Sequence, residues 1–155
     1  SFIVVPIAPP QFHWGRPQSN FMSATPFAFN SIKAMRSNYN IDQDRIYVSG
    51  YSMGGFGTFS AVTHAPDLFA AAIPLCSGWD PKLLNTLPNI PIWLFHGDKD
   101  TIIPAKYSRN FAKAANDNNQ LNVQYTELRN IGHNVWDYVY SDPEIWAWLL
   151  TQRRK

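Results

Sequence analysis

The pentapeptide Gly50-Tyr51-Ser52-Met53-Gly54 constrains the fold more than any other part of this chain, because of what lies on either side of it. The apolar run 45–49 before it is typical of a strand, and the small-residue run 55–62 after it is typical of a helix. A serine on such a sharp strand-to-helix turn has its hydroxyl in the open, and the flanking glycines allow the two elements to cross closely. The first turn of the helix directs its free N–H groups and its dipole at the same place.

Short apolar runs and helical patterns alternate along the rest of the chain. We expect strands at 2–8, 45–49, 69–76, 91–95 and 121–125, and helices from Thr25, from the serine turn to His64, over 104–115 and from Asp142. Continuous apolar runs indicate strands covered on both faces, whereas the alternating polarity of 121–125 predicts an edge strand. This order requires parallel crossovers, so we expect an α/β fold with three αβα layers and a mostly parallel sheet of about five strands. No linker divides the chain, which predicts a single domain over 1–155.

Composition excludes several classes of protein. The net charge of +2 is too small to indicate nucleic-acid binding, and no apolar run approaches the roughly 18 residues of a membrane span. No signal peptide is visible, and the sequence gives no basis for a localisation. Cys76 is the single cysteine, so it forms no internal disulfide and no cysteine-based metal site, and its apolar neighbours predict a buried thiol. We expect neither a metal nor a cofactor.

The chemistry of an open α/β sheet gathers beyond the carboxyl ends of its strands. Ser52, the loop 97–101 and His133 each follow a different expected strand, so all three should open at the same rim. A serine hydroxyl is a poor nucleophile at neutral pH and needs an adjacent base with a group that orients it. The three loops therefore predict a site for nucleophilic catalysis.

Four histidines could supply the base. His133 follows the last strand at the rim and is the predicted base. His96 ends a strand, where a packed and hydrogen-bonded structural role is expected, and His64 is expected to cap helix carbonyl groups. His13 lies in an early loop with no partner pattern.

Three aspartates could orient that base: Asp80, Asp98 and Asp100. Loop aspartates commonly form turns, which is the alternative interpretation of each. The spacing favours Asp100, which lies deeper in its loop and just before the run that starts the next helix, and leaves Asp98 to form the turn.

Five segments together carry a resemblance to a known family: Gly50-Tyr51-Ser52-Met53-Gly54-Gly55, His96-Gly97-Asp98-Lys99-Asp100 with Ile103-Pro104, Gly132-His133, Asp42-Gln43-Asp44-Arg45-Ile46, and Ala65-Pro66-Asp67-Leu68-Phe69. The chain resembles the α/β-hydrolase superfamily over essentially its whole length. The resemblance is to the single-domain esterase branch, which contains feruloyl and acetylxylan esterases, polyhydroxybutyrate-depolymerase-like enzymes and phospholipase/carboxylesterase-type enzymes.

The resemblance implies a role for each residue of the site. Ser52 is the expected nucleophile, Asp100 the orienting acid and His133 the general base, and the backbone N–H of Met53 is one oxyanion donor. The implied activity is hydrolysis of short-chain or aryl carboxylic esters through an acyl-enzyme, with a small-molecule ester as substrate. The alternatives are a serine peptidase of the prolyl-oligopeptidase kind and a non-catalytic remnant of a hydrolase.

The sequence departs from the family at its beginning. In the family, the second oxyanion donor follows an earlier strand, which would precede Phe2, so we expect a truncated fold that lacks the N-terminal strands and corresponds to the C-terminal portion of the full fold. The family's strand order also puts that strand between segment 2–8 and the strand at 45–49. Either the sheet has a gap there, or 2–8 moves into it, or another polypeptide fills it. An uncovered strand edge promotes association, so we expect a homo-oligomer or a strand-swapped dimer.

Six tryptophans contribute to an aromatic content of 15%. Trp79 lies in a rim loop, Trp136 follows His133, and Tyr51 precedes the serine. These side chains are expected either to cover the core or to form the wall of an acyl or aryl pocket, and both interpretations stay open.

Overall fold

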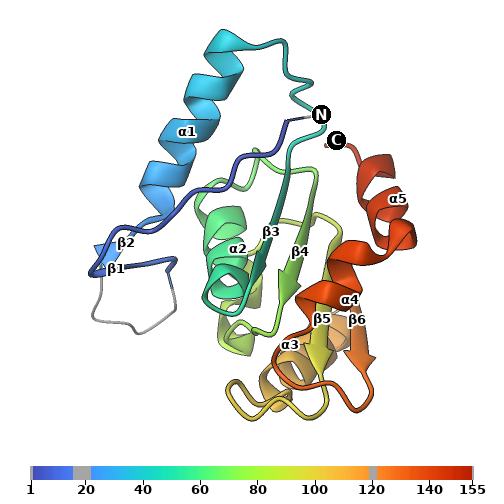
Figure 1. The fold of residues 1–155 in the computed structure, drawn as a ribbon. Helices are drawn as coiled ribbons and strands as arrows, with labels where there is room; N and C mark the ends of the chain where they lie inside the picture. The colour runs from blue at the N-terminus through green and yellow to red at the C-terminus, as the bar shows by residue number, and fades with distance from the viewer. Residues whose placement is uncertain (1, 16–21, 119–121, 155) are drawn as a thin grey trace.

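The computed structural model describes residues 2–15, 22–118 and 122–154. Its centre is a parallel sheet in the order β3-β4-β5-β6, formed by Tyr47–Tyr51, Ala71–Leu75, Ile92–Gly97 and Val123–Leu128 (Figure 1). A second sheet pairs two short strands, β1 (Phe12–His13) and β2 (Met22–Ser23). The predicted α/β fold with a parallel sheet and flanking helices is confirmed, with four strands in the main sheet.

The helices lie on both faces of the sheet and complete three layers. They are α1 (Thr25–Asn38), α2 (Met53–His64), the 3-10 helix η1 (Pro81–Thr86), α3 (Lys106–Asn118), α4 (Trp136–Ser141) and α5 (Pro143–Thr151). The side chains of α2 and α3 share one core cluster with Ala72 of β4, whereas those of α4 and α5 share another with Ile73 and Leu75. Neighbouring residues of β4 thus point to opposite faces, as a strand covered on both sides requires.

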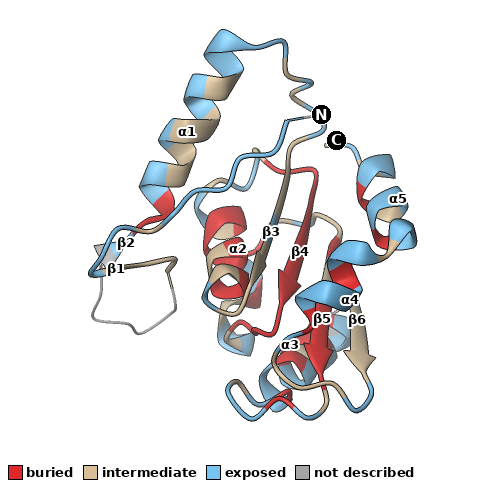
Figure 2. Ribbon diagram, in the orientation of Figure 1, coloured by how far each residue is buried: buried red, intermediate tan, exposed pale blue. Residues whose placement is uncertain are grey.

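The two inner strands carry the core. All of β4 is buried, as are most of β5 and the inner face of α2, while β3 and β6 at the edges are only half-buried (Figure 2). Phe59 on α2 and Phe111 on α3 have no exposed surface, and their rings meet edge to face at 4.8 Å. β6 is an edge strand, as its alternating polarity predicts.

The expectation of a strand at 2–8 is wrong. Residues 2–9 have no regular secondary structure, and the side chains of Phe2, Ile3, Val5 and Ile7 are all more than half exposed. In the order of the main sheet β3 is the outermost strand, and segment 2–9 runs away from it towards β1 (Figure 1). A strand requires a partner for its N–H and C=O groups, and no described strand lies beside this segment. Among the described residues β3 is therefore an uncovered edge of the main sheet, and segment 2–8 does not move beside it.

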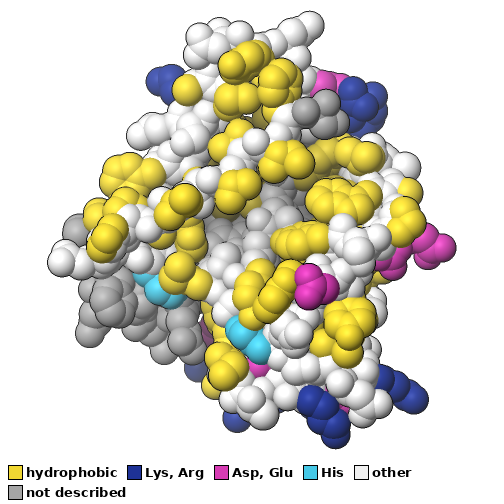
Figure 3. All heavy atoms as spheres, viewed as in Figure 1, with side chains coloured by type: hydrophobic (Ala, Val, Ile, Leu, Met, Phe, Trp, Pro, Cys, Tyr) yellow, Lys and Arg dark blue, Asp and Glu magenta, His cyan; other side chains and the backbone are white. Residues whose placement is uncertain are grey.

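The segment leaves apolar side chains on the surface. Figure 3 shows hydrophobic side chains spread over this face of the molecule, while Lys and Arg lie towards its periphery. Within the described residues, no helix is both long enough and apolar enough to span a bilayer.

Parallel pairing brings the carboxyl ends of β3, β5 and β6 to one end of the molecule. The loops after these strands begin at Ser52, Asp98 and Arg129. The two chain termini lie together at the opposite end (Figure 1). The three loops that the sequence predicts to form a site therefore lie at one rim of the sheet.

Candidate active site

Ser52 occupies a strained turn between β3 and α2. Its φ of 55° and ψ of −113° lie in a region that L-residues rarely adopt, and its N–H donates to the Leu75 carbonyl oxygen at 2.9 Å, which ties the turn to β4. Met53 and Gly54 follow in the first turn of α2, where backbone N–H groups have no acceptor within the helix. The hydroxyl and these N–H groups therefore share one small region.

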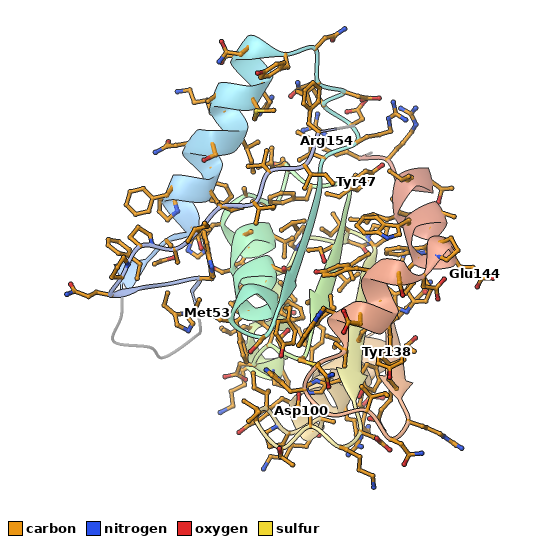
Figure 4. The ribbon with its side chains drawn as sticks, in the orientation of Figure 1. Tyr47, Met53, Asp100, Tyr138, Glu144 and Arg154 are labelled. Carbon is orange, nitrogen blue, oxygen red and sulfur yellow. The ribbon has the colours of Figure 1, made fainter. Side chains whose placement is uncertain are left out.

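Ser52, His133 and Asp100 form a continuous chain of hydrogen bonds. Ser52 Oγ lies 2.9 Å from His133 Nε2, and His133 Nδ1 lies 2.7 Å from Asp100 Oδ2. Figure 4 places Met53 and Asp100 at the end of the sheet to which the strand arrows point. Because an ionised carboxylate only accepts hydrogen bonds, Nδ1 carries the ring hydrogen and Nε2 accepts from the serine hydroxyl.

Asp100 is buried, with 8% of its surface exposed, and is held on both carboxylate oxygens. Oδ1 accepts from the N–H groups of Ile102 and Ile103, both at 2.9 Å. Burial opposes ionisation, but the hydrogen bonds from His133 and from the two amides outweigh it, so the pKa of Asp100 lies below its usual value of 3.8. The carboxylate of Asp100 is therefore ionised at neutral pH, where it accepts the hydrogen bond from the His133 imidazole.

A second histidine, His96, contacts the same carboxylate, and the sequence did not predict this contact. His96 is completely buried, and its Nε2 lies 3.1 Å from Asp100 Oδ2 and 2.8 Å from the Ile103 carbonyl oxygen. Its Nδ1 lies 2.6 Å from Oγ of Ser108, which itself donates to the Ser77 carbonyl oxygen. The expected packed and hydrogen-bonded role is confirmed, but nothing in the spacing identified Asp100 or Ser108 as its partners.

Cys76 lies beneath the site as a buried thiol, as expected. Its Sγ–H donates to the His133 carbonyl oxygen at 3.2 Å, and burial raises its pKa to about 12, so it stays protonated. Among the described residues, Cys76, His96 and Asp100 are one group whose potential metal-ligand atoms lie within 4.8 Å of one another. Each of these atoms already makes a hydrogen bond within the site, and we assign no metal to them.

The other candidate histidines and aspartates make contacts within their own helices and turns. Asp80 caps η1 by accepting from the Lys82 N–H at 2.9 Å, and Asp98 lies in the turn that follows β5. His64 contacts the Ser60 carbonyl oxygen at 2.8 Å near the end of α2, as its capping role predicts. His13 accepts from the Gly15 N–H.

The aromatic candidates separate into two groups. The ring of Tyr51 lies 4.8 Å from that of His133 and 4.7 Å from that of Trp136, whose side chain is 37% exposed. Trp79 is only 7% exposed and stacks on Phe59 at 5.5 Å within the core. Of the two interpretations of Trp79, these contacts favour the one in which it covers the core, because its ring packs in the cluster of Phe59 and Phe111.

The two glycines that flank Ser52 should differ sharply in their tolerance of substitution. A methyl group at Gly50 would lie 2.2 Å from the Gly54 carbonyl oxygen, whereas a methyl group at Gly54 meets nothing within 4 Å. Gly50→Ala should lower the free energy of unfolding by about 1–3 kcal/mol, and Gly54→Ala should leave it unchanged or raise it by up to about 1 kcal/mol. Denaturant unfolding measures both, and equal effects would contradict the close crossing of β3 and α2.

The structure and the sequence resemble known esterases. Residues 15–142 match the family model described as Phospholipase/Carboxylesterase. The crystal structure of a thermostable esterase superposes with a TM-score of 0.78 at 36% identity, covering 83% of this chain and 36% of that one.

Two characterised relatives match shorter stretches. The bifunctional acetylxylan esterase/xylanase XynS20E of Neocallimastix patriciarum is 35% identical over 85 residues, which are 53% of this chain and 12% of the relative. Cutinase 2 of Thermobifida cellulosilytica is 39% identical over 75 residues, which are 48% of this chain and 27% of the relative. This chain thus spans a minor part of the length of each. On the family match and the superposed esterase together, the chain belongs to the phospholipase/carboxylesterase family of α/β-hydrolases.

Proposed function

We propose that this chain is a serine hydrolase of carboxylic esters, with Ser52 as nucleophile, His133 as general base and Asp100 as the acid that orients it. One observation carries the proposal: the hydrogen bonds of 2.9 and 2.7 Å that run from Ser52 through His133 to Asp100. These distances are those at which a base takes a proton from a nucleophile. Membership of a carboxylesterase family supports an ester as the substrate.

In the acylation step, Ser52 Oγ attacks the ester carbonyl carbon while His133 Nε2 takes the hydroxyl proton. The imidazolium that forms is stabilised by the carboxylate of Asp100, and it then donates the proton to the leaving alkoxide as the carbon–oxygen bond of the ester breaks. The products of this step are an alcohol and an acyl group on Ser52.

Deacylation repeats the same proton transfers with water. His133 takes a proton from water as the water oxygen attacks the acyl carbonyl, and returns that proton to Ser52 as the carboxylic acid leaves. In both steps the N–H of Met53 would donate to the carbonyl oxygen as it becomes negative, because it lies in the first turn of α2 beside the nucleophile. One such donor contributes about 100- to 1000-fold to turnover.

The proposal predicts covalent labelling of one residue. A fluorophosphonate should modify the wild-type chain on Ser52, and Ser52→Ala should abolish the labelling, as measured by intact mass and peptide mapping. Asp100→Asn should slow labelling by roughly 10³- to 10⁴-fold, because the amide favours the wrong tautomer of His133. Asp80→Asn is the matched control, since Asp80 only caps η1, and it should label at the wild-type rate.

The same experiment separates the alternatives. A folded wild-type sample that does not label would favour a non-catalytic remnant and end the hydrolase proposal. Cleavage of a prolyl amide faster than of a matched ester would favour a peptidase of the prolyl-oligopeptidase kind instead.

We propose further that Tyr51 and Trp136 form an aromatic wall that favours aryl or short acyl esters. Tyr51 lies between His133 and Trp136, so an aromatic substituent at the reacting carbon would meet these rings. Trp136→Ala should raise KM for a hydroxycinnamate ester by about 3- to 10-fold and leave KM for an acetate ester unchanged. Trp146→Ala is the control, because this tryptophan has similar exposure on α5 but stacks on Tyr140. Equal changes for both esters would contradict the wall.

We also propose that copies of this chain associate through the outer edge of β3. This edge has no strand partner among the described residues, and the apolar side chains of segment 2–7 are exposed. Light scattering should detect a concentration-dependent dimer that the double substitution Ile3→Lys, Val5→Lys reduces. Leu150→Lys on α5 should have no effect, and a wild-type monomer at high concentration would contradict the proposal.

A further inference from the structure

The buried ring of His96 makes a polar contact with Asp100 in addition to packing in the core. Its Nε2 faces two acceptors at once, Asp100 Oδ2 at 3.1 Å and the Ile103 carbonyl oxygen at 2.8 Å. Two acceptors at these distances require a hydrogen on Nε2, because a bare ring nitrogen would repel both oxygens. His96 therefore acts as a donor to the same carboxylate oxygen that receives the His133 Nδ1–H.

The carboxylate of Asp100 has about as many hydrogen-bond donors as it can accept once His96 is included. A carboxylate offers about four acceptor positions. The Ile102 and Ile103 amides occupy Oδ1, while His133 and His96 occupy Oδ2. Without His96, the imidazole that holds Oδ2 would be that of His133, the group that Asp100 itself has to orient.

The ring of His96 is in turn held in place from its other side. Oγ of Ser108, on α3, lies 2.6 Å from Nδ1 and also donates to the Ser77 carbonyl oxygen in the loop after β4. Burial lowers the pKa of His96, although the hydrogen bond to the Ile103 carbonyl oxygen and the charge of Asp100 act in the opposite direction. The two oxygens that face Nε2 require a hydrogen on that nitrogen whatever the charge of the ring. The ring thus links β5, α3 and the loop after β4 to the carboxylate.

We propose that His96 is a positioning residue for ester hydrolysis, whose Nε2–H holds Asp100 Oδ2 in the orientation that fixes the His133 ring. The inference rests on the proposed function of Ser52, His133 and Asp100. His96 is completely buried, and its hydrogen bonds run to Asp100, Ile103 and Ser108. Its removal should therefore lower the rate of the chemical step and leave substrate binding intact.

A pair of substitutions isolates the donated hydrogen bond. The amide nitrogen of glutamine lies as many bonds from Cα as Nε2 of histidine, so His96→Gln keeps an N–H donor, whereas His96→Leu keeps only bulk. With rates normalised to the number of reactive Ser52 residues, His96→Leu should lower kcat by about 10- to 100-fold at unchanged KM. His96→Gln should restore most of that loss, and the control His64→Leu, on the far end of α2, should leave kcat unchanged.

A second measurement tests the hydrogen position without relying on activity or on the folding of His96→Leu. With only four histidines in the chain, selective ¹⁵N labelling of the imidazole rings resolves each of them. We expect a hydrogen on Nε2 of His96, and a low-field proton signal from His133 Nδ1–H that persists in His96→Gln. An Nε2 of His96 that carries no hydrogen would overturn the proposal.

The outcomes separate this inference from the proposed function. If the wild-type chain labels on Ser52 and His96→Leu retains the wild-type kcat, or if His96→Gln is as impaired as His96→Leu, His96 is only a structural residue. If the wild-type chain does not label at all, the proposed function fails, and the ring-nitrogen measurement still decides whether Nε2 of His96 carries the hydrogen that donation to Asp100 requires.

Discussion

The hydrogen bonds to the buried carboxylate of Asp100 are the interaction on which the rest of the site depends. An ionised group in the protein interior is costly unless donors surround it, and here two backbone N–H groups and two imidazoles do so. The backbone donors come from Ile102 and Ile103 in its own loop, and the imidazoles come from the end of β5 and from the loop after β6. The carboxylate therefore joins two neighbouring strands of the sheet and fixes the geometry of His133.

The close approach of these loops depends on backbone atoms that have no side chain between them. A methyl group at Gly97 would lie 2.2 Å from the Gly132 carbonyl oxygen, so this glycine lets the loop of Asp100 approach the loop of His133. Gly50 plays the same part where β3 crosses α2, beside the strained backbone of Ser52. The strain of Ser52 persists because β4 accepts its N–H and α2 begins immediately after it. Contacts between these segments thus hold backbone conformations that their local sequences would not adopt on their own.

Much of this arrangement could be predicted from the sequence because local patterns determine it. Buried apolar runs and helical spacing predicted the parallel α/β sheet, and the carboxyl-end rule placed Ser52, Asp100 and His133 at one rim. At two places the local pattern was not enough: the strand expected at 2–8 is absent, and the sequence left two interpretations of Trp79 open. Segment 2–8 has the composition of a strand but finds no partner, and Trp79 lies in a rim loop but folds inward onto Phe59. The local sequence indicates which structure a segment could form, but it does not indicate whether a partner strand or a core surface lies next to it in the fold.

By itself the sequence determined the class of fold, the strand-to-helix turn at Ser52 and the three loops from which a site could be built. These follow from residue order, because apolar periodicity and glycine positions act over a few residues. Only the tertiary structure decided that Asp100 lies between two imidazoles, that Ser108 and Cys76 support the site from below, and that β3 is left as an edge. The physical reason is that each of these depends on hydrogen bonds or pairings between segments far apart in the chain, whose geometry exists only after the sheet has formed.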